Sequence, residues 1–292
     1  MISVAVIGSK GQLGTDLVET LQRTNDYRVF ALSHEQIDCT EQASVRKVLA
    51  EMRPEVVVNC AAFVRVDECE DCPEKAFRVN SLGALHVARV CAEINALCGY
   101  VSTDYVFDGG KGEPYTEEDG PHPINVYGTS KLAGEQLVQQ ACPRWFIVRM
   151  AALFGKAGAL AKGGNFVEAV LSKARKGELL RIVKDIWTSP TYTWDAAQVL
   201  ERLIQHRSTG IFHVVNEGGC SWFELAQKVI DIVGLSGKLE PVLSSNYPMK
   251  ARRPQDSRLK SIRLDPALVG PLRPWQEAVR IYLAEKGYIT SS

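Results

Sequence analysis

The sequence predicts an α/β protein built on a doubly wound parallel sheet, with a smaller substrate-binding lobe towards the C-terminus. Three observations lead to this prediction. Short apolar runs alternate with helix-like segments through the first half of the chain, which is typical of a parallel sheet covered on both faces. A glycine-rich turn follows the first apolar run. Beyond about residue 150 the alternation becomes less regular, which indicates a second structural unit.

The first half of the chain contains five predicted strands with helices between them. Residues 2–7 ("ISVAVI") form the first strand, and residues 12–22 then carry helical spacing of apolar positions. The longest helix begins at a proline, whose missing N–H is harmless in a first turn. The further strands are predicted at residues 27–32, 55–62, 99–103 and 145–150, and the further helices at residues 42–52, 73–95 and around Tyr127.

The second half is predicted to return to the sheet once and otherwise to build the lobe. Helical spacing appears at residues 165–177, 193–205 and 221–235, the last opening on a serine cap, and residues 210–215 have the pattern of a strand. The stretch from Leu239 to Pro274 is proline-rich and predicted to be irregular. We expect residues 1–155 with about 179–215 to form one domain, and about 156–178 with 216–292 to form the lobe.

Composition excludes several classes of function. The 34 basic and 34 acidic residues give a net charge of zero, which argues against nucleic-acid and membrane-surface binding. The N-terminal apolar run is too short for a signal segment or a membrane span, so a cytoplasmic protein is expected. The eight cysteines lack paired zinc spacing, so we expect reduced thiols and no metal site. A homodimer is the assembly that general frequency favours.

The turn "GSKGQLG" is the first candidate binding feature. Gly8, Gly11 and Gly14 lie between the first strand and first helix, where glycines permit close approach to a pyrophosphate at a helix N-terminus. This position predicts a Rossmann-type dinucleotide site. The tip of the second strand carries Ser33 in place of an acid, with Glu35 as a late substitute, so NADP(H) is slightly favoured over NAD(H).

A second candidate feature joins Thr103, Tyr127 and Lys131. Thr103 ends a predicted strand at the edge where open α/β sheets bind ligands. Tyr127 and Lys131 lie four apart on a predicted helix and therefore share one face. A tyrosine has a pKa near ~10, and a neighbouring positive charge favours the phenolate. We expect Thr103 to hold a substrate carbonyl while Tyr127 delivers a proton.

With these motifs the chain resembles the extended short-chain dehydrogenase/reductases, and within them the dTDP-4-dehydrorhamnose reductase family. The resemblance covers nearly the whole chain. It is carried by "GSKGQLG", "NCAAFVRVDECE", "VN" at 79–80, "STDYVFDG", "NVYGTSKLAGE", "RMAALFG", "GGNFV", "SPTYTWDAA", "CSWFELA" and "ARRPQDSRL".

The resemblance implies roles for individual residues. The cofactor would contact the glycine turn, the second strand's tip and the end of the third strand, while the nucleotide sugar would lie beside Thr103. The implied cofactor residues are Gly8, Gly11, Gln12, Leu13, Gly14, Ser33, Asp38, Cys39, Ala61, Ala62, Phe63, Tyr127 and Lys131. The implied substrate residues are Thr103, Asp104, Val106, Ala152 and Asn165, with Arg253 of the Arg252/Arg253 pair.

The chain departs from the family pattern around the sugar. Where the family carries a tryptophan against the sugar this chain has Ala152, and an aromatic platform removed from a pocket should change affinity or substrate. The other departures are Val64 for threonine, Ile186 for glutamine, Thr188 for glycine and Ser33 for an acid. None of them removes the residues expected to act in hydride transfer.

The sequence therefore predicts NAD(P)H-dependent reduction of the C4 keto group of a nucleotide-linked 4-keto-6-deoxy sugar, with dTDP-4-dehydro-L-rhamnose favoured. Dehydration is disfavoured because Tyr105 occupies the position where the related dehydratases carry a glutamate. A nucleotide-sugar epimerase stays open as an alternative. So does a non-catalytic, NADP-binding relative resembling the regulatory subunit of methionine adenosyltransferase.

Overall fold

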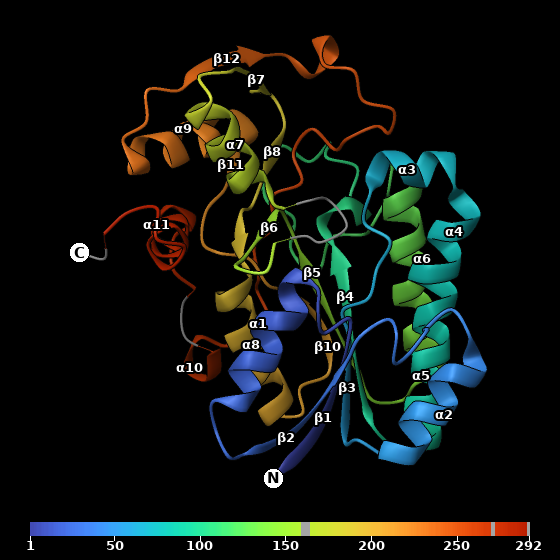
Figure 1. Cartoon of the computed structure of the whole chain (residues 1–292). Helices are drawn as coiled ribbons and strands as arrows, with labels where there is room; N and C mark the ends of the chain where they lie inside the picture. Colours follow the sequence, from blue (N-terminus) through green and yellow to red (C-terminus); the bar gives the residue numbers. More distant parts are fainter. Residues whose placement is uncertain (159–163, 270–271, 291–292) are drawn as a thin grey trace.

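A six-stranded parallel sheet forms the centre of the molecule in the computed structural model, which describes residues 1–158, 164–269 and 272–290. The strand order is β10-β5-β4-β3-β1-β2, and each neighbouring pair runs parallel (Figure 1). The predicted doubly wound α/β class is thereby confirmed. The strands are β1 (Ile2–Ile7), β2 (Tyr27–Leu32), β3 (Val56–Asn59), β4 (Leu97–Thr103), β5 (Trp145–Met150) and β10 (Gly210–His213).

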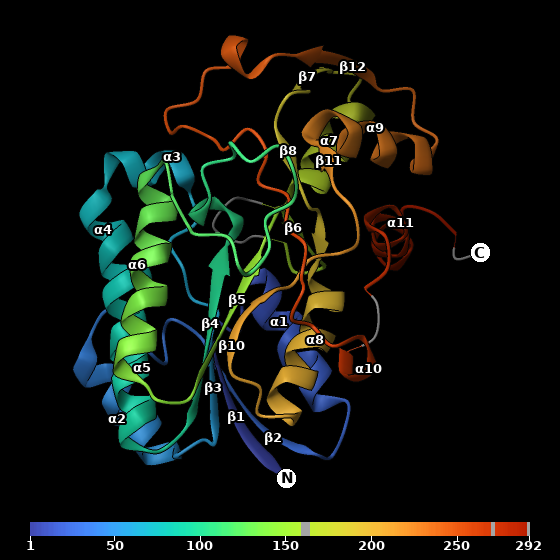
Figure 2. The ribbon, with the colours of Figure 1, turned by 180° about the vertical axis from the view of Figure 1, so that it is seen from behind.

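Helices cover both faces of this sheet (Figures 1 and 2). Strand β1 shows why its sequence is continuously apolar. Val4 and Val6 enter one core cluster while Ala5 and Ile7 enter the other, because successive side chains point to opposite faces. One face is covered by α1 (Gln12–Gln22) and α8 (Thr193–Gln205), and the other by α2 (Gln42–Met52), α5 (Gly83–Glu93) and α6 (Val126–Ala141).

The long helix expected at residues 73–95 is interrupted. It begins as α4 (Pro73–Phe77), passes through a π-helical turn, η1 (Arg78–Leu82), and continues as α5. A short helix that the sequence did not indicate, α3 (Val66–Asp71), precedes it. The π turn contains Asn80, which is fully buried. Such insertions often mark functional sites, and apolar periodicity alone does not reveal them.

The smaller lobe lies beyond the carboxyl ends of the strands (Figure 1). Its core joins residues that are far apart in sequence, from Phe154 to Leu283. The lobe contains α7 (Phe166–Arg175), β7 (Leu179–Val183), α9 (Trp222–Val233), β12 (Lys238–Val242) and α11 (Trp275–Glu285). Shorter elements are η2 (Asp104–Val106), β6 (Leu153–Phe154), β8 (Trp187–Thr188), β9 (Thr191–Tyr192), β11 (Cys220–Ser221), η4 (Ser244–Asn246) and α10 (Pro266–Val269).

The course of β7 bears on the boundary between the two units. The sequence led us to group residues from about 179 with the first domain, but β7 pairs in parallel with β12. Leu180 and Ile182 of β7 are buried in the lobe's core. We therefore propose that residues 179–183 belong to the lobe. Strand β12 also lies inside the stretch from Leu239 to Pro274, so that stretch is not wholly irregular.

Candidate active site

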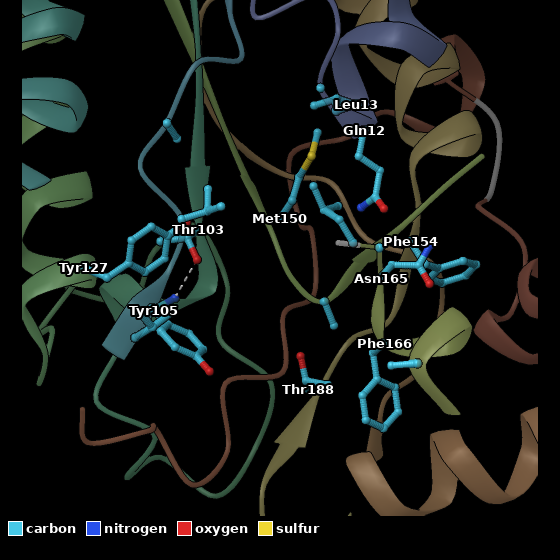
Figure 3. A pocket seen from close by; sticks show the side chains of 18 of the residues that line it. Gln12, Leu13, Thr103, Tyr105, Tyr127, Met150, Phe154, Asn165, Phe166 and Thr188 are labelled. Carbon is cyan, nitrogen blue, oxygen red and sulfur yellow. Dashed lines mark hydrogen bonds between the residues drawn. The ribbon is translucent and has the colours of Figure 1, made fainter. Parts of the chain in front are cut away.

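A cavity of about 1330 Å³ lies between the carboxyl ends of the strands and the lobe. Ligand pockets for one drug-sized molecule reach roughly 1,000 Å³, so this cavity has room for more than one such ligand. Thr103 and Tyr127 face it from one side, Asn165 and Phe166 from the other, and Gln12 and Leu13 from the end of α1 (Figure 3).

The glycine turn is built for close approach. Gly8 has a φ of +78°, and a side chain at Gly14 would bring its Cβ within 2.2 Å of the Gly8 carbonyl oxygen. No side chain caps the N-terminus of α1, which begins after Gly11, so its first N–H groups are available to an anion. Gly8, Gly11, Gln12, Leu13 and Gly14 all line the cavity. These features fit a dinucleotide pyrophosphate.

The tip of β2 carries both signs of charge. The hydroxyl of Ser33 donates a 2.5 Å hydrogen bond to the carboxylate of Glu35, and Lys10 of the glycine turn donates to the same oxygen at 3.2 Å. These bonds hold the pKa of Glu35 at about 2, with Ser33 the largest cause. The cavity is also lined here by Asp38 and Cys39. A carboxylate and an ammonium thus both lie where an adenosine ribose would bind.

Thr103, Asp104 and Tyr127 meet at the carboxyl end of β4. The Thr103 hydroxyl donates to Asp104 Oδ1 at 3.0 Å and accepts from the backbone N–H of Tyr105 at 3.2 Å (Figure 3). Burial raises the pKa of Tyr127, while the nearby Thr103 hydroxyl lowers it. The expected lowering of the Tyr127 pKa by Lys131 is therefore not the dominant effect.

Lys131 lies one turn beyond Tyr127 but directs its ammonium elsewhere. Its Nζ donates a 2.6 Å hydrogen bond to the carbonyl oxygen of Val101 and lies 4.1 Å from the ring centre of Tyr100. Burial lowers the pKa of Lys131 to about 7, against the attraction of Glu135. The ammonium thus lies against β4, within a wall of the cavity.

Helix α6 is held at its N-terminus and again at Glu135, which fixes the place of Tyr127. Asn125 caps the N-terminus by accepting from the N–H of Gly128 at 2.8 Å, and Glu70 accepts from the N–H of Val126 at 2.9 Å. Further along, the buried Glu135 receives two bonds from Arg149 of β5, at 2.9 and 2.7 Å. The helix is therefore tied to the sheet by a paired buried charge.

Two residues expected at the ligands lie away from the lining of this cavity, and their contacts with a ligand stay predictions. Phe63 does not line the cavity, because Asn80 binds both its N–H and its carbonyl and its ring lies 4.7 Å from the Lys75 ammonium. Val106 is fully buried in a small apolar cluster. The 3-10 turn η2 directs Asp104 and Tyr105 to the cavity and Val106 into the core. Ala61, Ala62 and Ala152 do line the cavity.

Asn165 and Arg253 also line the cavity, but their polar atoms are already engaged. Asn165 caps α7 through Glu168 N–H, and its amide donates to the Gly155 carbonyl and the Tyr282 hydroxyl. Arg253 makes two 3.0 Å bonds to Asp67, while Arg252 lies at the surface. Gly163 of the "GGNFV" motif falls outside the described residues.

Several cavity residues were not indicated by the sequence reasoning. Ser257 comes from the C-terminal segment and donates a 2.5 Å bond to Asp104 Oδ2. Tyr105 lies edge-on to Tyr127 with ring centres 6.0 Å apart. Phe166 and Trp222 form an aromatic pair in the lobe's wall, with ring centres 4.7 Å apart. All four residues lie in motifs that carry the family resemblance, namely Tyr105 in "STDYVFDG", Phe166 in "GGNFV", Trp222 in "CSWFELA" and Ser257 in "ARRPQDSRL".

The described part of the chain contains no cluster of three or more histidine, cysteine, aspartate or glutamate residues that could hold a metal ion. Within the same ranges, no helix is both long enough and apolar enough to cross a bilayer.

Comparison with known proteins matches residues 2–287 to the family described as the RmlD substrate binding domain. A dTDP-4-dehydrorhamnose reductase from Streptomyces griseus is 37% identical, over 94% of this chain and 90% of its own. The chain belongs to the dTDP-4-dehydrorhamnose reductase family. The expectation of an NAD(P)H-dependent oxidoreductase is confirmed with it.

Two further relatives span nearly the whole chain of this family member. The spore coat polysaccharide biosynthesis protein SpsK from Bacillus subtilis (strain 168) is 38% identical, covering 98% of both chains. The solved dTDP-4-dehydrorhamnose reductase from Bacillus anthracis, in complex with NADP, matches with a TM-score of 0.90 and 35% identity, over 98% of this chain and all of that one. The NADP complex agrees with the cofactor class expected from the sequence, NADP(H) or NAD(H).

Proposed function

We propose that this protein reduces the C4 keto group of a nucleotide-linked 4-keto-6-deoxy sugar with NADPH, and that its substrate is dTDP-4-dehydro-L-rhamnose. The observation that carries the proposal is the meeting of Thr103 and Tyr127 in a cavity that also contains the glycine turn. The names of the relatives support the sugar class, since a reductase of dTDP-4-dehydrorhamnose matches over nearly the whole chain.

The cofactor would be held at the carboxyl ends of β1 to β4. The uncapped N-terminus of α1 and the close turn at Gly8 and Gly14 would bind the pyrophosphate. Ser33, Asp38 and Cys39 would border the adenosine, and Ala61 and Ala62 would line the groove towards the nicotinamide. When bound, NADPH supplies the hydride that reduces C4 of the sugar.

The proton would come from Tyr127. Thr103 would bind the keto oxygen, and the Tyr127 hydroxyl would donate its proton as negative charge develops there. Lys131 would stabilise the resulting phenolate and hold the nicotinamide ribose. Asp104 and Ala152 would border the sugar. Asn165 would position α7 through its cap, and Arg253 would position the segment that carries Ser257 through its pair with Asp67.

An assay of NADPH oxidation with a panel of dTDP- and UDP-linked 4-keto sugars tests the proposal. We expect turnover with the dTDP-linked 4-keto-6-deoxy sugar and loss of at least about 100-fold in kcat for Tyr127→Phe. An epimerase would change the sugar without net loss of NADPH. A non-catalytic NADP-binding relative would bind the cofactor and oxidise none. Either result, or a fully active Tyr127→Phe variant, rejects the proposal.

Two other predictions from the sequence are kept as proposals. We propose that the protein acts in the cytoplasm and as a homodimer. Light scattering on the full chain measures its molar mass, and a mass of one chain at micromolar concentration rejects the dimer. Fractionation of cells that express the chain tests its location.

A further inference from the structure

Asp104 is a buried carboxyl group whose hydrogen bonds are not explained by substrate binding alone. Its side chain is 4% exposed and lines the cavity beside Tyr127. One carboxylate oxygen accepts from the Thr103 hydroxyl at 3.0 Å, and the other accepts from the Ser257 hydroxyl at 2.5 Å. The hydroxyl of the adjacent Thr103 and that of Ser257, 153 residues further along the chain, thus converge on this group.

The hydroxyl of Thr103 has a single proton, which limits what it can do. It accepts from the Tyr105 N–H, so one further partner can donate to it and one can receive its proton. While Asp104 is ionised, that proton points to Asp104. When Asp104 is protonated, Asp104 donates to Thr103 instead, and the Thr103 proton is released towards Tyr127. The protonation of Asp104 therefore sets the direction of the Thr103 hydroxyl.

We propose that Asp104 restores the proton of Tyr127 after each turnover, through the hydroxyl of Thr103. This inference rests on the proposed function. Lys131 offers a less direct route for a proton to reach Tyr127, because its ammonium donates to the Val101 carbonyl on β4. Thr103, in contrast, lies beside both Tyr127 and Asp104. Asp104 acts through Thr103 and is in this sense a positioning and proton-supplying residue.

Each proton transfer in the proposed relay breaks one O–H bond and forms another. In the reduction, the O–H bond of Tyr127 breaks and the O–H bond of the product alcohol forms, which leaves a phenolate. The Thr103 O–H bond then breaks as the Tyr127 O–H bond re-forms. The Asp104 O–H bond breaks as the Thr103 O–H bond re-forms, which leaves a carboxylate held by Ser257. Asp104 finally takes up a proton from hydronium or a buffer acid in the solvent, which completes the uptake of one proton per turnover.

The surroundings of Asp104 suit this task. Burial raises its pKa to about 6, and the bonds from Ser257 and Thr103 oppose that rise. The titratable and charged groups around it are Tyr105 on its own turn, Tyr127 from α6, and Arg253 with its partner Asp67 beyond Tyr105. A carboxyl group with this pKa can release and regain a proton near neutral pH.

Steady-state reduction measured from pH 5 to 9 tests the relay. In wild type, we expect kcat to fall as pH rises past the pKa of Asp104. Asp104→Asn should remove this fall of kcat with pH (the pH limb) and lower kcat by at least about tenfold. The variant should show a burst of one NADPH oxidised per chain, and imidazole buffer should partly restore its kcat. Ser257→Ala should move the limb to higher pH, because the Ser257 bond lowers the pKa of Asp104.

Several outcomes overturn the relay. The relay is rejected if Asp104→Asn keeps the wild-type pH limb. It is also rejected if kcat of this variant falls uniformly with pH and is not raised by imidazole, which indicates a structural role only. A limb that stays in place or moves to lower pH in Ser257→Ala also rejects it. If Asp104→Asn fails to fold, the Ser257→Ala shift decides alone. Failure of the proposed function is distinct, because wild type would then oxidise no NADPH.

Discussion

The ammonium of Lys131 is bonded at 2.6 Å to the carbonyl oxygen of Val101, inside the protein. Folding therefore carries a lysine from water, where its pKa is ~10.4, to a site where the pKa is about 7. Between these values the unfolded chain binds the proton more tightly, so this group lowers stability as pH falls from 10.4 to 7.

Lys131→Met should separate the stability and function of this lysine. At pH 7 we expect the free energy of unfolding of the variant to exceed that of wild type by about 1–3 kcal/mol, because no charge is buried. The gain should shrink as pH rises towards 10. Turnover should fall by at least about 100-fold. Urea unfolding at pH 7 and 10 with NADPH oxidation measures both, and an active, less stable variant contradicts the prediction.

Gly128 permits the close contact between α6 and η2. A Cβ at this position would lie 2.0 Å from the carbonyl oxygen of Tyr105. Gly128→Ala should push the helix away and separate Tyr127 from Thr103, so we expect kcat to fall by at least about 100-fold. Gly120→Ala is the matched control, since nothing lies within 4 Å of its Cβ. Equal activity of the two variants would show that the contact is not needed for turnover.

Ala152 lies at the cavity with a φ of +42°, in the left-handed region. An aromatic side chain there would offer the sugar a flat apolar surface. We expect Ala152→Trp to lower KM for dTDP-4-dehydro-L-rhamnose by about threefold or more, and to cost about 1 kcal/mol of stability from the strained backbone. Ala152→Gly, which relieves the strain and adds no ring, is the control. A higher KM for the tryptophan variant would indicate that this chain accepts a bulkier sugar.

Lys10 and Glu35 should set the choice between the two cofactors. Their side chains are 67% and 72% exposed and pair at 3.2 Å, so either can turn to a ribose substituent. Lys10→Ala should weaken NADPH binding by about 3- to 10-fold and leave NADH within twofold, because a 2′-phosphate favours a cation. Glu35→Gln should tighten NADPH by removing a like charge. Calorimetric titration measures both, with Lys47→Ala, outside the cavity, as the control.

His213 should make the protein less stable in mild acid. Its Nδ1 lies 3.0 Å from the Tyr115 carbonyl oxygen, and burial lowers its pKa to about 4. Glu117 opposes this shift and Arg149 adds to it. The unfolded chain therefore takes up a proton first as pH falls from 6.5 to 4, and stability drops in that window by about 1–3 kcal/mol.

His213→Asn should flatten this slope in urea unfolding measured at pH 4, 5.5 and 7. The exposed His206 provides the control, because His206→Gln removes a histidine from the surface and should leave the slope unchanged. A wild-type slope in His213→Asn would show that carboxylates alone cause the acid sensitivity.

The parallel sheet, its helical layers and the place of the glycine turn could all be predicted from the order of the residues. These features depend on local patterns, namely continuous apolar runs, helical spacing and glycine positions, whose effects extend over one element or one turn. The same holds for Tyr127 and Lys131, because four positions on a helix must share a face.

The contacts that each of these side chains makes depend on the packing of the folded chain. Helical spacing brings Lys131 near Tyr127, but only the packing of α6 on β4 directs its ammonium to Val101. The bond from Ser257 to Asp104 joins segments 153 residues apart, and the hold of Asn80 on Phe63 depends on a π turn. Contacts of this kind depend on how whole elements pack, and a linear pattern contains no record of that packing.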